Sequence, residues 1–169
     1  MSSSDRRTVL RGLGLLGLGT LSLGACGFTP AYGPAGAAGR LQNAILPDAP
    51  QGRDQYLLIQ RFEERLGRGE TGPYALGYTY ALNGARSAIT ADNVTTRFNY
   101  IGAVNFILRD LATGTQLLRG SVDGFSGFSL TGSTSATAAA ERDARARLAV
   151  VLADKMVTQL IAASTRLPA

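Results

Sequence analysis

The chain has 169 residues, with 17 Lys and Arg against 12 Asp and Glu, which gives a formal net charge of +5. It contains no His and one Cys, which excludes a His/Cys metal cluster, a Ser–His–Asp triad and a Cys–His pair. Residues 1–25 carry three Arg and one Asp, so +3 remains on the rest of the chain, too mild a charge to predict a nucleic-acid partner.

Residues 1–25 have the layout of an export signal. Three arginines precede an uncharged apolar run over residues 12–23, and this run is too short for a membrane span, which takes about 20 residues. The run ends in Leu23-Gly24-Ala25-Cys26, which resembles the lipobox of bacterial lipoproteins. We therefore expect cleavage before Cys26 and lipidation of its sulfur. The alternatives are a free thiol beside an ordinary cleavage site and an uncleaved anchor.

The export route stays open. Arg6-Arg7 partly matches a twin-arginine signal, but Asp5 and Val9 stand where that signal usually has Ser or Thr and Phe. A general secretory signal is the alternative. Residues 26–39 are rich in Gly, Ala and Pro and predict a tether between the lipid and a domain formed by residues 40–169.

The domain begins with a predicted strand and helix. Residues 40–46 are a modest strand candidate, and Asp48 is a candidate N-cap, with Pro50 in the first helical turn. Gly67 is the expected C-cap after a helix that ends near Leu66. The expected apolar face is Tyr56, Ile59, Phe62 and Leu66, with Arg61, Glu64, Arg65 and Arg68 towards the outer side.

Three strands are predicted next, without a helix between them. Residues 73–82 and 94–110 alternate apolar and polar side chains, which indicates half-buried strands. Residues 83–92 are polar and Gly-containing and predict a connection. Gly102 marks a candidate bulge. Asp110 to Gly114 predicts a hairpin turn, a strand is expected over 115–125, and a flexible edge over 124–135.

A long helix is predicted from about Ser135 to Ser164. Its expected apolar stripe is Ala140, Ala144, Leu148, Leu152, Met156 and Leu160, widened by Val151. Glu141 and Arg145, like Asp143 and Arg147, stand four residues apart and predict ion pairs on an exposed face. The whole order predicts an α+β fold, a two-layer sandwich of a four-stranded, mostly antiparallel sheet with two helices on one face.

Three motifs resemble one family. The first is Cys26-Gly27-Phe28-Thr29-Pro30-Ala31-Tyr32-Gly33, and the second is Arg109-Asp110-Leu111-Ala112-Thr113-Gly114 followed by Leu117-Leu118. The third is Ala140-Glu141-Arg142-Asp143-Ala144. Together, and in this order, they resemble the alphaproteobacterial type of the LPS-assembly lipoprotein family, LptE. The weak first strand departs from the family pattern and leaves that sheet edge open.

The resemblance implies a lipid-anchored protein on the periplasmic side of the outer membrane, without a cofactor. It implies a plug in the lumen of the LptD β-barrel, help with assembly of that barrel, and help in delivering lipopolysaccharide to the outer leaflet. Arginine suits phosphate groups, so Arg86 in the predicted connection, and Arg97 and Arg109 on the wet sheet face, are the candidate lipopolysaccharide contacts. For each, a solvated arginine is the plainer alternative.

Two other functional classes stay open. One is a free-standing envelope lipoprotein that binds another lipid or small ligand between sheet and helices. The other is an enzyme built on carboxylates, but the sequence shows no catalytic constellation, and we expect no enzymatic activity.

Overall fold

The computed structural model describes residues 33, 36, 38–89, 95–130 and 132–167. The predicted signal peptide, the lipobox with Cys26 and nearly all of the predicted tether lie outside these residues. The elements run in the order β1 (Ile45–Pro47), α2 (Arg53–Leu66), β2 (Tyr74–Ile89), β3 (Thr95–Asp110), β4 (Gln116–Ser129) and α3 (Thr134–Ala163), followed by a 3₁₀ turn, η2 (Ser164–Arg166).

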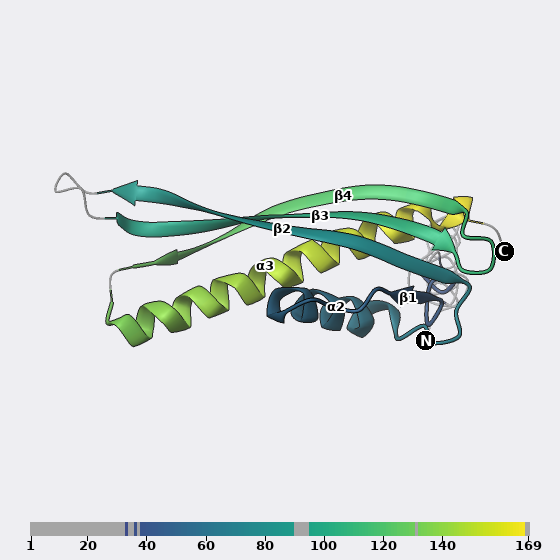
Figure 1. Ribbon diagram of the computed structural model, residues 1–169, viewed down its shortest axis with the longest axis horizontal. Helices are drawn as coiled ribbons and strands as arrows, with labels where there is room; N and C mark the ends of the chain where they lie inside the picture. The colour runs from purple at the N-terminus through teal and green to yellow at the C-terminus, as the bar shows by residue number, and fades with distance from the viewer. Residues whose placement is uncertain (1–32, 34–35, 37, 90–94, 131, 168–169) are drawn as a thin grey trace, which may run out of the picture.

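The four strands form one sheet in the order β1-β2-β3-β4. β1 pairs parallel to β2, as expected when a helix connects two neighbouring strands, and the other two pairings are antiparallel. Both helices lie on the same side of the sheet, and the body is elongated along the strands (Figure 1). The predicted α+β class is confirmed.

The first strand and helix begin later than predicted. Residues 38–44 form turns, and the Asn43 amide donates to the Leu66 carbonyl at 2.7 Å, which ties this segment to the end of α2. Asp48 is not the N-cap, because Pro50 disfavours helical backbone at the residue before it. The helix α2 starts after Gly52, whose φ is 95°. Gly67 is the C-cap, as predicted.

The strand β2 is longer than predicted. The Asn83-Gly84 pair signals a turn, yet both residues continue the ladder, opposite Ile101 and Tyr100 of β3. Arg86, expected in a connection, lies in the strand opposite Phe98. A long partner strand supplies hydrogen bonds to this segment, and this tertiary pairing overrides the local signal.

Gly102 is not at a bulge. The ladder runs unbroken through Leu82, Gly102 and Gly124 on the three strands. A Cβ on Gly102 would lie 2.9 Å from a methyl group of Leu152 and 3.1 Å from one of Leu148, so the glycine lets α3 approach the sheet. β4 also continues to Ser129, through half of the segment expected to be a flexible edge.

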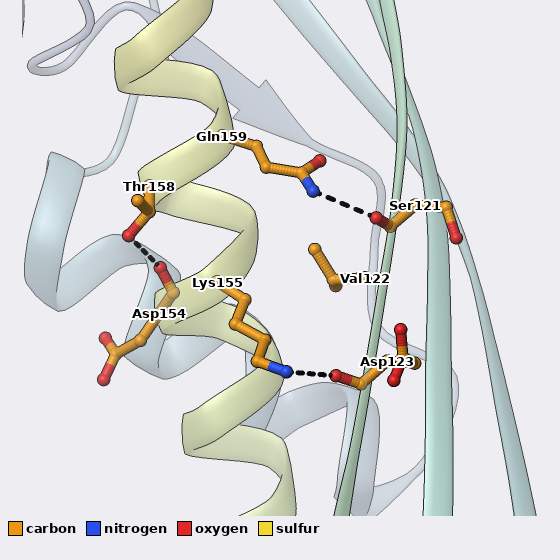
Figure 2. A pocket seen from close by; sticks show the side chains of 7 residues that line it. All are labelled: Ser121, Val122, Asp123, Asp154, Lys155, Thr158 and Gln159. Atoms are coloured by element: carbon orange, nitrogen blue, oxygen red, sulfur yellow. Dashed lines mark hydrogen bonds between the residues drawn. The ribbon is translucent and has the colours of Figure 1, made fainter.

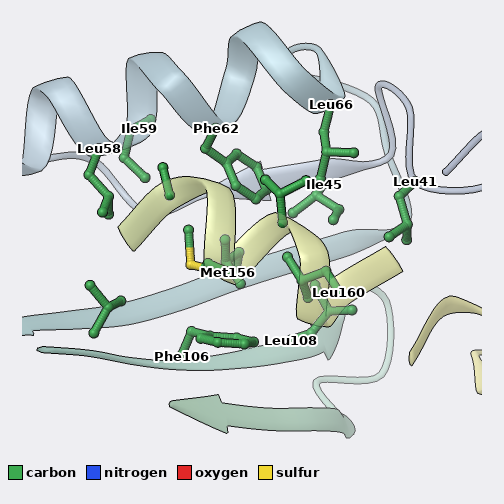
Figure 3. Packing of buried hydrophobic residues seen from close by; sticks show 14 of the residues in the cluster. Leu41, Ile45, Leu58, Ile59, Phe62, Leu66, Phe106, Leu108, Met156 and Leu160 are labelled. Carbon is green, nitrogen blue, oxygen red and sulfur yellow. The ribbon is translucent and has the colours of Figure 1, made fainter. Parts of the chain in front are cut away.

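The core lies between the sheet and the helices. In Figure 3 the side chains of α2 point towards α3, and Met156 and Leu160 of α3 lie above Phe106 and Leu108 of the sheet. Tyr56 was expected in the apolar face of α2 but is 59% exposed, and Leu58 is buried in its place. Nine residues of α3 are buried: Ala144, Leu148, Ala149, Leu152, Ala153, Met156, Val157, Leu160 and Ile161.

Two faces of α3 bury side chains, because the helix touches both the sheet and α2. Ala149, Ala153 and Val157 widen the stripe rather than Val151, which is 41% exposed. By length and composition Thr134–Arg166 could cross a membrane, but half of its apolar window is buried inside the protein. Packing on the sheet accounts for that apolarity.

Ion pairs join the two helices. Asp154 of α3 accepts hydrogen bonds from Arg61 Nε at 3.0 Å and Arg65 NH1 at 2.7 Å, so these two arginines face α3 rather than the outer side as predicted. At the other end of α2, Asp54 accepts from Arg145 at 2.5 Å and 3.1 Å. The predicted pairs Glu141–Arg145 and Asp143–Arg147 are present.

Candidate functional site

The most distinctive hollow lies where α3 begins, between its first turns and the far ends of β2, β3 and β4. It has a volume of about 350 Å³ and is lined by Arg86, Phe98, Tyr100, Phe128, Leu130 and Glu141. We call it the aromatic groove. Four of the six lining side chains are apolar or aromatic, and four of the six come from strands of the sheet.

The sheet register builds the floor of the groove. Arg86, Phe98 and Phe128 stand directly opposite one another on β2, β3 and β4, so all three point to the helix side of the sheet. The rings of Phe98, Tyr100 and Phe128 form one cluster with centroids 5.4–5.8 Å apart. Gly84 leaves room for it, since a Cβ there would lie 2.6 Å from the Phe98 ring.

On the helix side, the groove is lined by Glu141, and the α3 residues before it have small side chains. The first seven residues of α3, Thr134 to Ala140, are Thr, Ser and Ala. None of these can reach across to the aromatic cluster as Leu148 and Leu152 reach the middle of the sheet.

Two charged side chains line the groove, Glu141 and Arg86, and they differ in whether they have partners. The Tyr100 hydroxyl donates to Glu141 at 2.5 Å, and Arg145 lies 3.9 Å from the same carboxylate and 5.7 Å from the centre of the Tyr100 ring. Burial, and then the bond to Glu141, raise the pKa of Tyr100. Arg86 is exposed and forms no ion pair or hydrogen bond within the part of the chain that the structure describes. An unmatched cation thus stands beside an apolar floor.

The three predicted arginines do not form one site. Arg97 and Arg109 lie exposed on the outer face of the sheet, as expected, but twelve residues apart on β3, about 40 Å at about 3.3 Å per residue. Arg86 is on the opposite face. Cys26 lies outside the described residues.

A second hollow, of about 470 Å³, lies between β4 and α3 (Figure 2). Lys155 Nζ donates to the Asp123 carbonyl at 2.6 Å, and Gln159 donates to the Ser121 carbonyl at 3.1 Å. Arg147 donates a hydrogen bond to the Gly127 carbonyl at 3.2 Å. These side chains cap the open edge of β4, so we assign this hollow a structural role.

The outer face of the sheet is not covered by a helix (Figure 1). It carries polar and apolar side chains, among them the cross-strand pair Ile101 and Phe125, which are 49% and 73% exposed. Among the described residues, no three His, Cys, Asp or Glu side chains gather as metal ligands.

Five of the six lining residues were missed as site residues from the sequence, and Phe98 and Tyr100 were considered only as part of a strand. Phe128 and Leu130 lie in a segment that was expected to be a flexible edge, and Glu141 was considered only as a partner of Arg145. One signal could have found Phe128. Val122, Gly124, Ser126 and Phe128 continue the two-residue period of β4 on the face that turns towards the helices.

No protein-family model and no curated protein matches the chain. Solved structures do. A candidate lipoprotein from Caulobacter crescentus CB15 aligns with a TM-score of 0.65 and 25% identity over 79% of this chain and 98% of that one. Rare lipoprotein B from Shewanella oneidensis aligns with a TM-score of 0.53 and 11% identity, over 72% of this chain and 94% of that one.

A minor lipoprotein from Acinetobacter baumannii aligns with a TM-score of 0.52 and 14% identity, over 74% of this chain and 92% of that one. The last two likenesses are below 25% identity and show the fold alone. This chain shares its fold with these three proteins, whereas membership of the LPS-assembly lipoprotein family stays a prediction. Its assignment to the alphaproteobacterial type stays a prediction.

Proposed function

We propose that this protein is an outer-membrane lipoprotein of the LptE type, anchored on the periplasmic side through Cys26. In this role it plugs and helps to assemble the LptD β-barrel, and it helps to deliver lipopolysaccharide to the outer leaflet. The observation that supports the proposal is the likeness of the fold to that of rare lipoprotein B, together with residues 1–26, which resemble a signal ending in a lipobox. The proposed role is not enzymatic.

The shape and surface of the domain agree with a plug. The lumen of a large membrane β-barrel is polar, so a domain that fills it needs a polar outside. The uncovered sheet face has Arg97, Asn99, Asn105 and Arg109 among its exposed or half-exposed side chains, and the body is elongated along the strands (Figure 1).

Lipopolysaccharide contact is proposed through Arg86, Arg97 and Arg109. Guanidinium groups bind phosphate with paired hydrogen bonds. Because these three arginines lie on two faces and at two ends of the sheet, we expect separate contacts around the domain rather than one binding site. Gly27 after the lipidated cysteine agrees with sorting to the outer membrane, since Asp at that position is the usual signal for retention at the inner membrane.

The test is co-purification from detergent-solubilised outer membrane, with mass spectrometry of the proteins that accompany the tagged protein. We expect a large β-barrel protein in a 1:1 ratio. The matched control is Cys26→Ser, which we expect to lose both the lipid and the outer-membrane fraction. Wild-type protein with an unmodified Cys26, or without a barrel partner, would contradict the proposal.

A free-standing, lipid-binding lipoprotein is the second candidate. The aromatic groove favours it, because the groove lies between sheet and helix and is mostly apolar. In the same experiment this role predicts a bound amphiphile and no barrel protein.

A further inference from the structure

We propose that the aromatic groove binds one acyl chain of a single-chain anionic lipid, such as a fatty acid, with its headgroup held by Arg86. This inference does not rest on the proposed function, because it concerns a site on the domain itself and holds with or without a barrel partner.

The lining selects an acyl chain. Phe98, Phe128 and Leu130 offer apolar surface, and the polar groups of Tyr100 and Glu141 already bond to each other. A peptide in the groove would need partners for its own backbone N–H and C=O groups, and the lining leaves few of them. A hydrocarbon chain has no such groups.

The volume selects one chain. A hollow of about 350 Å³ has room for part of one hydrocarbon chain. A lipid with several chains would leave most of its hydrocarbon outside the groove.

The charge selects an anionic headgroup. Glu141 is matched by Tyr100 and Arg145, and Arg145 is also bonded to Asp54 at 2.5 Å. Arg86 alone among the lining residues carries a charge without a partner in the described part of the chain. Its position opposite Phe98 places the guanidinium group next to the aromatic floor, where a carboxylate at the end of a bound chain would meet it.

The test uses the full mature chain with Cys26→Ser, so that the protein's own lipid does not compete. Laurate is titrated by calorimetry below its micelle concentration, and dodecyltrimethylammonium, with the same chain length and a cationic headgroup, is the matched ligand. We expect laurate to bind at least tenfold more tightly. Arg86→Gln should weaken laurate binding about tenfold and abolish the preference, with an unchanged melting temperature because Arg86 is exposed.

Two further variants separate headgroup from chain. Leu130→Ser should weaken both ligands alike, since it removes apolar contact only. Arg97→Gln is the matched control, an exposed arginine on the opposite face of the sheet, and should change neither affinity. Equal binding of the two ligands, no effect of Arg86→Gln, or binding of purified lipopolysaccharide without any binding of laurate would overturn the proposal.

Discussion

Two tyrosines of β2 have unusual environments. Tyr78 donates a long hydrogen bond to Gln55 at 3.4 Å, whereas the Tyr80 hydroxyl is buried without a partner in the described part of the chain. Burial, with the charges of Asp48 and Asp54 respectively, raises the pKa of each to about 12. Both phenols are therefore held neutral well above the pH at which they would ionise in the unfolded chain.

This shift predicts an alkaline loss of stability. Because the pKa is higher in the folded state, the two tyrosines contribute their full stabilisation below about pH 10, and it is lost as the pH rises towards 12. We expect the melting temperature to fall steeply over this range. The double variant Tyr78→Phe/Tyr80→Phe should flatten the fall, and an equally steep fall in that variant would contradict the explanation.

Tyr80→Phe alone should be neutral at pH 7, or stabilising by up to about 1 kcal/mol. Removing a buried hydroxyl that lacks a partner relieves its desolvation cost and leaves the ring in place. Chemical denaturation measures the effect, with Tyr78→Phe as the matched variant that loses a hydrogen bond. A loss of more than about 1 kcal/mol would mean that the Tyr80 hydroxyl has a partner.

At the scale of elements, the contact between α2 and α3 depends on Asp154. Burial alone would raise the pKa of Asp154, but hydrogen bonds and charges from Arg61 and Arg65 outweigh it and hold the pKa below its ordinary value. A carboxylate with a lowered pKa stabilises the fold above its unfolded pKa, near 4, and that contribution is lost as the pH falls through the folded value.

Asp154→Asn should therefore cost about 1 kcal/mol at pH 7 and less at pH 2, because the contribution is lost as the carboxylate is protonated. The cost is small because about a third of the Asp154 side chain is exposed to solvent, which screens the pairs. Denaturation at both pH values measures it. Asp143→Asn, which removes an exposed pair with Arg147 along one helix, should cost a few tenths of a kcal/mol. Equal costs for the two variants would contradict the assignment.

The close approach of α3 to the sheet predicts that two glycine-to-alanine variants differ in stability. Gly102→Ala should cost about 1 kcal/mol, because its Cβ meets Leu152 at 2.9 Å and the leucine must shift. Gly124→Ala, whose Cβ would lie at an ordinary 3.4 Å from Val151, should be close to neutral. Thermal unfolding of both variants checks the prediction, and the reverse order would mean that α3 crosses elsewhere.

The elements with a clear period were predictable from the sequence. The alternation around Phe106 and the helical spacing from Ala144 to Leu160 give the strands, the last helix and the fold class. Predictions from local sequence were wrong where contact with a distant segment determines the structure. Asn83-Gly84 joins a ladder with β3, Arg61 and Arg65 turn towards Asp154, and Tyr56 faces solvent. The pattern of a single segment contains none of these partners.

The candidate site was predictable only in part. Arg86 was singled out for its charge, but its position opposite Phe98 and Phe128 depends on the register of three strands. Of α3, Glu141 lines the groove, and no pattern in the sequence sets its distance from the strands. Shape of this kind arises from how the helix lies over the sheet.

At the scale of the whole molecule, the two ends of the domain differ. One end is closed by α2, α3 and a continuous core. At the other end, the start of α3 and the ends of β2 and β3 lie at about the same level along the body, and the aromatic groove is there (Figure 1).

Leu148→Asp, which places a charge among buried residues near the middle of α3, should destabilise by more than about 4 kcal/mol. An unchanged melting temperature would contradict the packing of α3.

The proposed role in lipopolysaccharide delivery can be tested by depleting the protein in living cells and following newly made, labelled lipopolysaccharide to the cell surface. We expect surface labelling to fall while lipopolysaccharide accumulates inside the envelope. Wild-type protein should restore delivery, whereas Cys26→Ser should not. Normal surface delivery after full depletion would contradict it.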